Sequence, residues 1–207
     1  MLIKKIEELK NSEVARIIEE RIKEFKAFKD KPNEEWFKEL CFCLLTANSS
    51  AELGIKIQKE IDDGFLYLSQ EELEKRLREL GHRFYKKRAE YIVKARKYKD
   101  NIKDIIQNFR DEKRGREFLV KHIKGLGYKE ASHFLRNVGY DNIAIIDRHI
   151  LRELHDNNYI KEIPKSLSKK RYLEIEKILE DIARETRLKL SELDLYIWYL
   201  RTGKVLK

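Results

Sequence analysis

Apolar residues recur at three- and four-residue spacing through almost the whole chain, and only two prolines, Pro32 and Pro164, interrupt them. This spacing places apolar side chains on one face of a helix, and proline is the residue that most disrupts a helix interior. The run "IAII" at 143–146 is the only strand-like stretch, and it is too short to build a sheet. The sequence therefore predicts an all-α protein.

Cap and turn residues divide the pattern into separate helices. We expect Asn33 to cap one helix, Ser69 with Glu72 to form a capping box for another, and Ser191 with Asp194 to cap the last. The remaining helices are expected at about 84–98, 100–108, 112–123, 129–138 and 147–156, and from Ser168 after a polar linker.

The charge balance favours a polyanionic partner. The 207 residues include 46 Lys and Arg against 37 Asp and Glu, a net charge of +9, and 42% are hydrophobic, which is enough for a core. The alternative is a protein whose basic surface serves only its solubility, because such a protein would have the same composition. Abundant Lys, Glu and Arg with few Asn and Gln are typical of proteins from hot-growing organisms.

The pattern of the two cysteines does not indicate a metal or redox site. Cys41 and Cys43 flank Phe42 in an apolar run, where they are expected to be small buried hydrophobes. A zinc site or a four-cysteine iron–sulfur cluster needs ligands that this chain lacks, so we expect no cofactor. Charges recur every few residues at the N-terminus, which argues against a signal peptide or a membrane span and favours a cytoplasmic protein.

The stretch "HIKGLGYKEASHFLRNVG" at 122–139 places Gly125 and Gly127 between two helical patterns, with Leu126 available to enter the core and Lys129 at the second helix's start. This predicts a helical hairpin. Glycines permit positive φ and leave N–H groups uncovered, and the next helix adds its positive dipole end, so the turn can hold a phosphate. The competing interpretation is a C-cap glycine beside a flexible connector.

Eighteen residues after Lys129, Asp147 stands between "IAII" and "RHIL", where its carboxylate would cap the next helix. His133 and His149 lie near these two residues in sequence. We expect both histidines to be packed or DNA-facing and assign neither a catalytic role.

Together, "KGLGYKEASHFLRNVG" and "AIIDRH" resemble the helix-hairpin-helix and Gly/Pro-Asp signature of base-excision DNA glycosylases. "LCFCLLTANSS" and "LGHRFYKKRAEYI" resemble that family's buried early helix and its wedge loop. The short basic C-terminus resembles the compact archaeal type of 8-oxoguanine glycosylase/AP lyase. The resemblance implies an all-α, two-lobed fold with a DNA cleft between a lobe at 30–143 and a second lobe made of 1–29 and 144–207.

The resemblance also implies a mechanism in which Lys129 is the nucleophile and Asp147 assists it. Amine attack on a flipped nucleotide would expel 8-oxoguanine and leave a Schiff base, from which β-elimination cleaves the strand. We expect a monomer acting on damaged double-stranded DNA. The alternatives are an endonuclease III-like glycosylase for oxidised pyrimidines and a non-catalytic DNA-binding hairpin, in which Lys129 is a surface or phosphate-binding lysine and Asp147 only a cap.

For recognition of the lesion, the resemblance points to the chain end. Lys207 is expected to separate 8-oxoguanine from guanine, Trp198 to stack on the flipped base and Asp194 to bind its polar edge. Core packing is the alternative for Trp198, and a frayed terminus is the alternative for Lys207.

On the DNA side, Phe84 or Tyr85 is expected to fill the gap left in the duplex, and Asn48 to meet the unpaired partner base. Ordinary core packing competes for both aromatic side chains.

Overall fold

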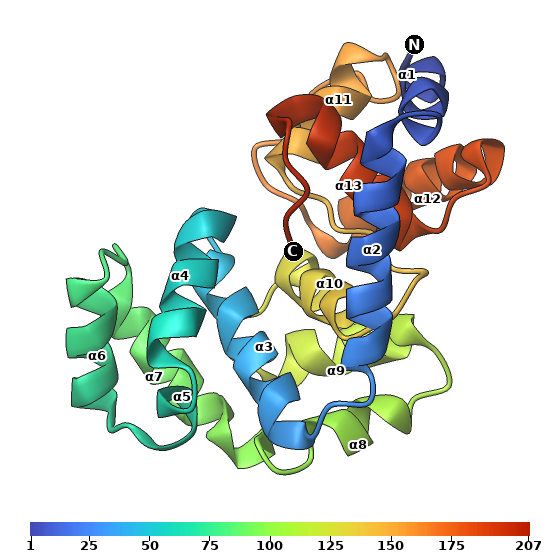
Figure 1. Ribbon diagram of the computed structural model, residues 1–207. Coiled ribbons are helices and arrows are strands. Elements are labelled where there is room, and N and C mark those ends of the chain that lie inside the picture. Colours follow the sequence, from blue (N-terminus) through green and yellow to red (C-terminus); the bar gives the residue numbers. More distant parts are fainter.

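A computed structural model describes residues 1–207, and it contains helices and no strand, so the all-α prediction is confirmed (Figure 1). The helices are α1 (Leu2–Lys10), α2 (Glu13–Phe28), α3 (Asn33–Thr46), α4 (Ala51–Ile61), α5 (Gly64–Tyr67), α6 (Gln70–Glu79), α7 (Tyr85–Ala95), the 3-10 turn η1 (Arg96–Tyr98), α8 (Ile102–Gln107), α9 (Glu112–His122), α10 (Tyr128–Asn137), α11 (Arg148–Asp156), α12 (Lys169–Thr186) and α13 (Leu190–Thr202). None of them combines the length and apolar character needed to cross a bilayer.

The predicted capping box is confirmed. The Ser69 hydroxyl accepts a hydrogen bond from the Glu72 N–H at 3.2 Å, and the Glu72 carboxylate accepts one from the Ser69 N–H at 2.8 Å. This reciprocal pair satisfies two N–H groups that have no partner inside α6.

The Asn33 cap prediction is wrong, because Pro32 holds the N-cap position of α3 and Asn33 is its first residue. The Asn33 side chain instead accepts a hydrogen bond from the Lys103 N–H at 2.7 Å and donates one to Asp104 at 2.8 Å. It therefore joins α3 to α8.

The predicted cap of the last helix is also wrong. Ser191 and Asp194 lie inside α13, and the Ser191 hydroxyl donates to Asp141 at 2.9 Å. Glu192 provides the cap contact, by accepting from the Lys189 N–H at 2.7 Å.

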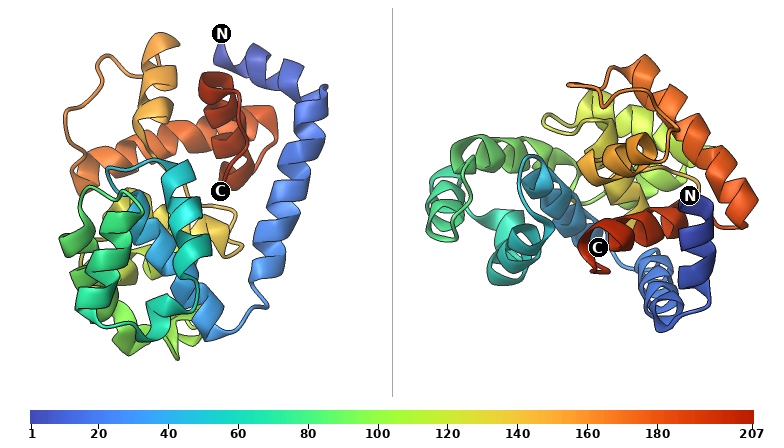
Figure 2. Two further views of the ribbon diagram at one scale, coloured as in Figure 1. Left: turned by 60° about the vertical axis from the view of Figure 1, so that its left-hand side comes forward. Right: turned by 90° about the horizontal axis from the view of Figure 1, so that it is seen from above.

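Buried apolar side chains form two clusters. One draws on residues between 36 and 143, and the other combines residues from 2–25 with residues from 144–197. Figures 1 and 2 show the first helices beside the last ones, with α1 against α12 and α13 and α2 against α13. We propose that the clusters mark the lobes expected at 30–143 and at 1–29 with 144–207.

Helix α10 lies where the two clusters meet, because it packs against α3 and α9 on one side and α2 on the other. This packing from both sides gives α10, including its N-terminal end, a fixed position. The chain descends from α13 and ends beside α10 (Figures 1 and 2).

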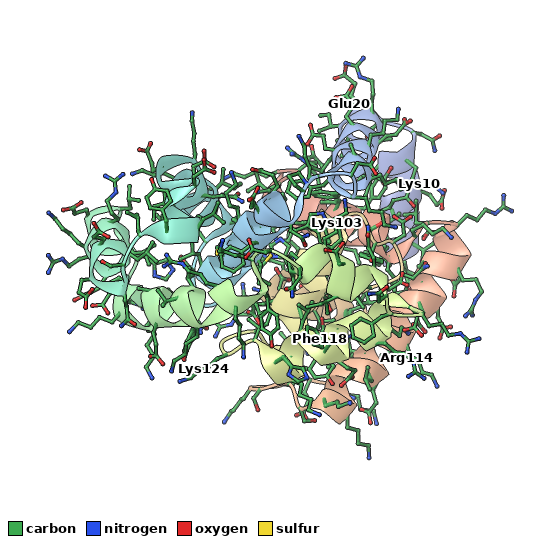
Figure 3. All side chains as sticks on the ribbon, turned by 90° about the horizontal axis from the view of Figure 1, so that it is seen from below. Lys10, Glu20, Lys103, Arg114, Phe118 and Lys124 are labelled. Atoms are coloured by element: carbon green, nitrogen blue, oxygen red, sulfur yellow. The ribbon has the colours of Figure 1, made fainter.

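Cys41 and Cys43 are fully buried in α3, as predicted. Charged side chains project around the rim of the molecule, seen from below in Figure 3.

Candidate active site

The predicted hairpin is present, with α9 and α10 joined by the turn that contains the two glycines. Leu126 between them is 5% exposed and belongs to the first core cluster. Gly125 has φ of +96°, and a Cβ added there would lie 2.3 Å from the Tyr91 ring. This position therefore requires glycine for both its backbone conformation and its space.

The expectation of an uncovered N–H group at Gly127 is wrong. Its backbone is extended, and its N–H donates to Glu130 Oε2 at 3.2 Å in a cap of α10. Glu130 follows the hairpin lysine directly, so the carboxylate that caps the helix also lies beside that lysine.

Lys129, the second residue of α10, has a side chain that is 28% exposed, with Nζ 3.5 Å from Glu130 Oε1. It lines a cleft of about 830 Å³ together with Asp147 and Asn48. Asn48 has φ of +58° in the polar turn after α3. Asn48 is 81 residues from Lys129 and 99 residues from Asp147 in the sequence, and the fold brings all three to one opening between α3, α10 and α11.

Asp147 caps α11 as predicted. Its Oδ1 accepts hydrogen bonds from the N–H groups of His149 and Ile150, each at 2.8 Å. The contacts fix the carboxylate at the positive end of the helix dipole. Since the same residue lines the cleft, a carboxylate of fixed position lies in the same cleft as the lysine.

A second pocket shares Lys129 with this cleft. It measures about 280 Å³, and His133 and Trp198 also line it. A third pocket of about 60 Å³ shares His133 and Trp198 and adds Asp194 and Lys207. The structure therefore brings the three residues predicted to recognise the base together, next to the predicted nucleophile.

Asp194 is 9% exposed and accepts a hydrogen bond from the Arg136 guanidinium at 2.6 Å. Burial raises the pKa of Asp194 to about 7; the Asp147 charge acts in the same direction, whereas the charges of Arg136 and Lys129 oppose it. Asp147 and Lys129 affect the pKa of Asp194 because the cleft that they line lies close to the pocket that Asp194 lines.

Lys207 is a fixed part of the site and not a frayed terminus. Its ammonium donates to Glu39 Oε2 at 2.8 Å and lies 4.3 Å from the centre of the Phe42 ring. Both partners are on α3, in a run whose side chains are all buried. The last residue of the chain is thereby attached across the pocket to the first core cluster.

The two histidines are packed, as predicted. His133 is 7% exposed, lies edge-on to Phe42 at 5.5 Å, and has no hydrogen-bond partner at Nε2. Burial holds its pKa well below the usual value, and the charges of Arg136 and Lys129 act in the same direction. His149 lies edge-on to Trp198 at 5.8 Å.

The two wedge candidates differ in their surroundings. Tyr85 packs against the first core cluster as the first residue of α7. Phe84 precedes that helix and lies under the Arg83 guanidinium at 4.6 Å, and Arg83 lines the cleft. Phe84 is therefore the aromatic side chain nearer to the cleft lining and less tied to the core.

The residues that the sequence did not single out are Glu39 and Arg136, which contact the predicted recognition residues. Each is a charged residue in an otherwise buried helix segment, and this is the only signal in the sequence that could have identified them.

An all-helical chain whose glycine hairpin presents a lysine to a cleft, which an aspartate that caps the next helix also lines, has the fold of the helix-hairpin-helix DNA glycosylases. The family described as 8-oxoguanine DNA glycosylase matches residues 18–188. The chain belongs to this family, and the resemblance inferred from sequence is confirmed.

Individual relatives are similar over their whole length. The 8-oxoguanine DNA glycosylase/AP lyase of Methanocaldococcus jannaschii is 75% identical over 100% of both chains. The crystal structure of that enzyme in complex with 15mer DNA containing 8-oxoguanine matches with a TM-score of 0.98 and 74% identity, over 100% of both chains. The Thermotoga maritima 8-oxoguanine DNA glycosylase has a TM-score of 0.94 at 48% identity, over 100% of this chain and 98% of that one.

Proposed function

We propose that this protein removes 8-oxoguanine from double-stranded DNA and then cleaves the strand 3′ to the abasic site. The observation that carries the proposal is the shared cleft of Lys129 and Asp147, at the N-terminal ends of α10 and α11. The full-length similarity to enzymes named 8-oxoguanine DNA glycosylase/AP lyase supports the choice of lesion. One chain supplies every group of this site, so we propose that it acts as a monomer.

In the proposed reaction, the Lys129 side chain leaves its contact with Glu130, gives a proton to solvent and attacks C1′ of a flipped nucleotide as the free amine. The C1′–N9 bond breaks as the Nζ–C1′ bond forms, and the leaving base takes up the proton that the attached nitrogen loses. The sugar ring then opens to a Schiff base between C1′ and Nζ, and the ring oxygen O4′ takes up a proton from solvent. Loss of a proton from C2′ then expels the 3′ phosphate, so one residue serves both steps.

Asp147 would stabilise the positive charge that develops on the sugar during this attack. Its carboxylate is held in place by two N–H groups at 2.8 Å, so it needs little reorganisation when the charge appears. The cap and the catalytic role are compatible, since the cap contacts engage only Oδ1 of the carboxylate.

The flipped base would enter the 280 Å³ pocket, with Trp198 stacking on it and Asp194 and Lys207 at its polar edge. We propose Phe84 as the side chain that fills the gap in the duplex, because Tyr85 packs on the core. Asn48, which also lines the cleft, would meet the unpaired base. The hairpin turn at Gly125 and Gly127 would lie against the phosphate backbone.

Borohydride trapping on duplexes that carry a single lesion tests the function. We expect a covalent adduct, together with strand cleavage, on the 8-oxoguanine duplex and much less on an oxidised-pyrimidine duplex. A preference for the oxidised pyrimidine would overturn the proposed substrate, and binding without any adduct would overturn the proposed chemistry.

A further inference from the structure

We propose that Glu39 is a positioning residue for lesion recognition: it binds the Lys207 ammonium on α3, away from the base, and so leaves the terminal carboxylate as the group that meets the base. This inference rests on the proposed function, because it assigns a purpose to the way Lys207 is held. It depends on the contacts of a buried carboxylate whose partner is 168 residues away in the chain.

The contacts form what we call the tail clamp, consisting of Glu39, Gln58 and Asn137. Glu39 Oε2 accepts from the Lys207 ammonium at 2.8 Å and from Gln58 Nε2 at 3.0 Å, and its Oε1 accepts from Asn137 Nδ2 at 2.7 Å. The Gln58 side-chain oxygen accepts a further hydrogen bond from the Lys207 ammonium. The tail clamp therefore joins α3, α4 and α10 to the chain end.

Burial makes this ion pair a strong constraint. Glu39 is 1% exposed, and Lys207 is the only cationic group within 4 Å of its carboxylate. A buried charge without a partner is costly, and removing one member of a buried pair costs much more than removing one from an exposed pair. The nearby pair of Lys204 with Glu52 is exposed, although its distance is also 2.8 Å. The tail is therefore held chiefly by its last residue.

The tail clamp is continuous with the other end of the base pocket. Asn137 Oδ1 accepts from Arg136 Nε at 3.0 Å, and the Arg136 guanidinium donates to Asp194 at 2.6 Å. Arg136 and Asn137 are both at most 3% exposed, on the helix whose second residue is the predicted nucleophile. The two polar groups proposed to meet the base are thus fixed relative to each other through α10.

The chemistry of guanine and 8-oxoguanine explains why the Lys207 ammonium should be kept away from the base. Guanine presents an acceptor at N7, whereas 8-oxoguanine presents an N–H donor there. An ammonium can only donate and a carboxylate can only accept, so an ammonium at this edge would favour guanine and a carboxylate would favour the lesion. Binding of the ammonium by Glu39 thus determines which base the chain end prefers.

The first test measures selectivity in near-isosteric variants. Glu39→Gln removes the charge that binds the ammonium, and Gln58→Met removes an acceptor at a less buried position. We expect the ratio of 8-oxoguanine to guanine excision to fall about tenfold in Glu39→Gln and less in Gln58→Met. Cleavage at a pre-formed abasic site should stay at the wild-type rate in both. The matched control is Glu52→Gln, which removes the exposed tail pair and should keep the wild-type ratio.

The second test measures the tail directly, without activity. Carboxypeptidase B removes a C-terminal lysine only when that residue is free. We expect Glu39→Gln to release Lys207 at least about five times faster than either the wild type or Glu52→Gln, while far-ultraviolet circular dichroism and the melting temperature report whether the variant is folded. If Glu39→Gln does not fold, Gln58→Met gives the same comparison.

Deletion of Lys207 separates failure of this inference from failure of the proposed function. Loss of selectivity in the deletion, with unchanged selectivity in folded Glu39→Gln, would overturn the role of Glu39 and leave the role of Lys207 intact. Equal release of lysine from Glu39→Gln and the wild type would also overturn it. No excision of 8-oxoguanine by the wild type would instead contradict the proposed function.

Discussion

Lys129 and Asp147 each lie at the N-terminal end of a helix, and the two helix ends face one cleft. The lysine follows a hairpin whose apolar plug, Leu126, is buried, and the aspartate is tied by two hydrogen bonds to its own helix. Neither group depends on a mobile loop for its position, so the effects of substitutions on rate and on stability can be separated.

Asp147→Asn and Asp147→Ala should differ in stability but not in rate. Asparagine retains a cap oxygen, so Asp147→Asn should cost less than about 0.5 kcal/mol of unfolding free energy, whereas Asp147→Ala should cost about 1 kcal/mol. Both should slow base excision by at least about tenfold, because both remove the charge. Denaturant titration and single-turnover excision measure the two effects. Ser168→Ala removes the comparable cap of α12 and should lose stability alone; a similar loss of rate in that variant would show that the Asp147 effect is only structural.

The two hairpin glycines should respond differently to alanine. Gly125→Ala places a Cβ at positive φ and 2.3 Å from the Tyr91 ring, and should cost at least about 1–2 kcal/mol of stability. Gly127→Ala places a Cβ 3.1 Å from Glu130 Oε2 in extended backbone and should cost less than about 1 kcal/mol. Gly127→Ala should nonetheless weaken binding to damaged and undamaged duplexes equally, which fluorescence anisotropy measures. Unchanged affinity for both duplexes would remove the turn from the interface.

The wedge assignment predicts opposite outcomes for neighbouring residues. Phe84→Ala should leave stability within about 0.5 kcal/mol and slow excision from a duplex, because the gap left by the flipped base is unfilled. Tyr85→Ala should cost about 2 kcal/mol of stability, since that ring packs on the core. Thermal unfolding and excision assays on both variants check this, and a duplex-specific defect confined to Tyr85→Ala would reverse the assignment.

The sequence predicted those parts of the site whose geometry is local. The distance from the glycines to Lys129 and the position of Asp147 before its helix follow from one hairpin and one cap. Asn33 and Ser191 were misassigned because each side chain bonds to a residue distant in the chain, at Asp104 and Asp141 respectively. A local cap pattern carries no information about such partners.

The attachment of Lys207 to Glu39 could not be predicted from the sequence for the same reason. The last residue alone indicates a mobile end. Only the tertiary arrangement brings the end of the chain to α3 and provides a buried carboxylate for its ammonium. The charge of Glu39, in a buried run that also contains Lys38, signals that some partner is needed, but not which one.

His133 predicts a pH dependence of stability. Its folded-state pKa lies well below that of the unfolded chain, so the unfolded state binds more protons as the pH falls, and the stability present above about pH 6.5 is lost below it. This loss approaches about 1.4 kcal/mol per pH unit until the folded-state pKa is reached. The raised pKa of Asp194 acts in the opposite direction, so the comparison must be made against a variant.

His133→Gln should therefore gain stability relative to the wild type between pH 7 and pH 5.5, as measured by denaturant titration at both values. His155→Gln, at a position whose side chain is 42% exposed, serves as the control and should follow the wild type. If the difference in unfolding free energy between His133→Gln and the wild type is the same at the two pH values, the His133 ring can be protonated in the folded state.

The most direct test of the central claim is the location of the trapped adduct. Borohydride reduction during turnover on an 8-oxoguanine duplex, followed by nuclease digestion and peptide mass spectrometry, should find the sugar remnant on Lys129. Lys129→Gln should release no base and form no adduct, while its affinity for the lesion duplex stays within about threefold of the wild type. An adduct on another lysine, or trapping by Lys129→Gln at the wild-type rate, would contradict the assignment of Lys129 as the nucleophile.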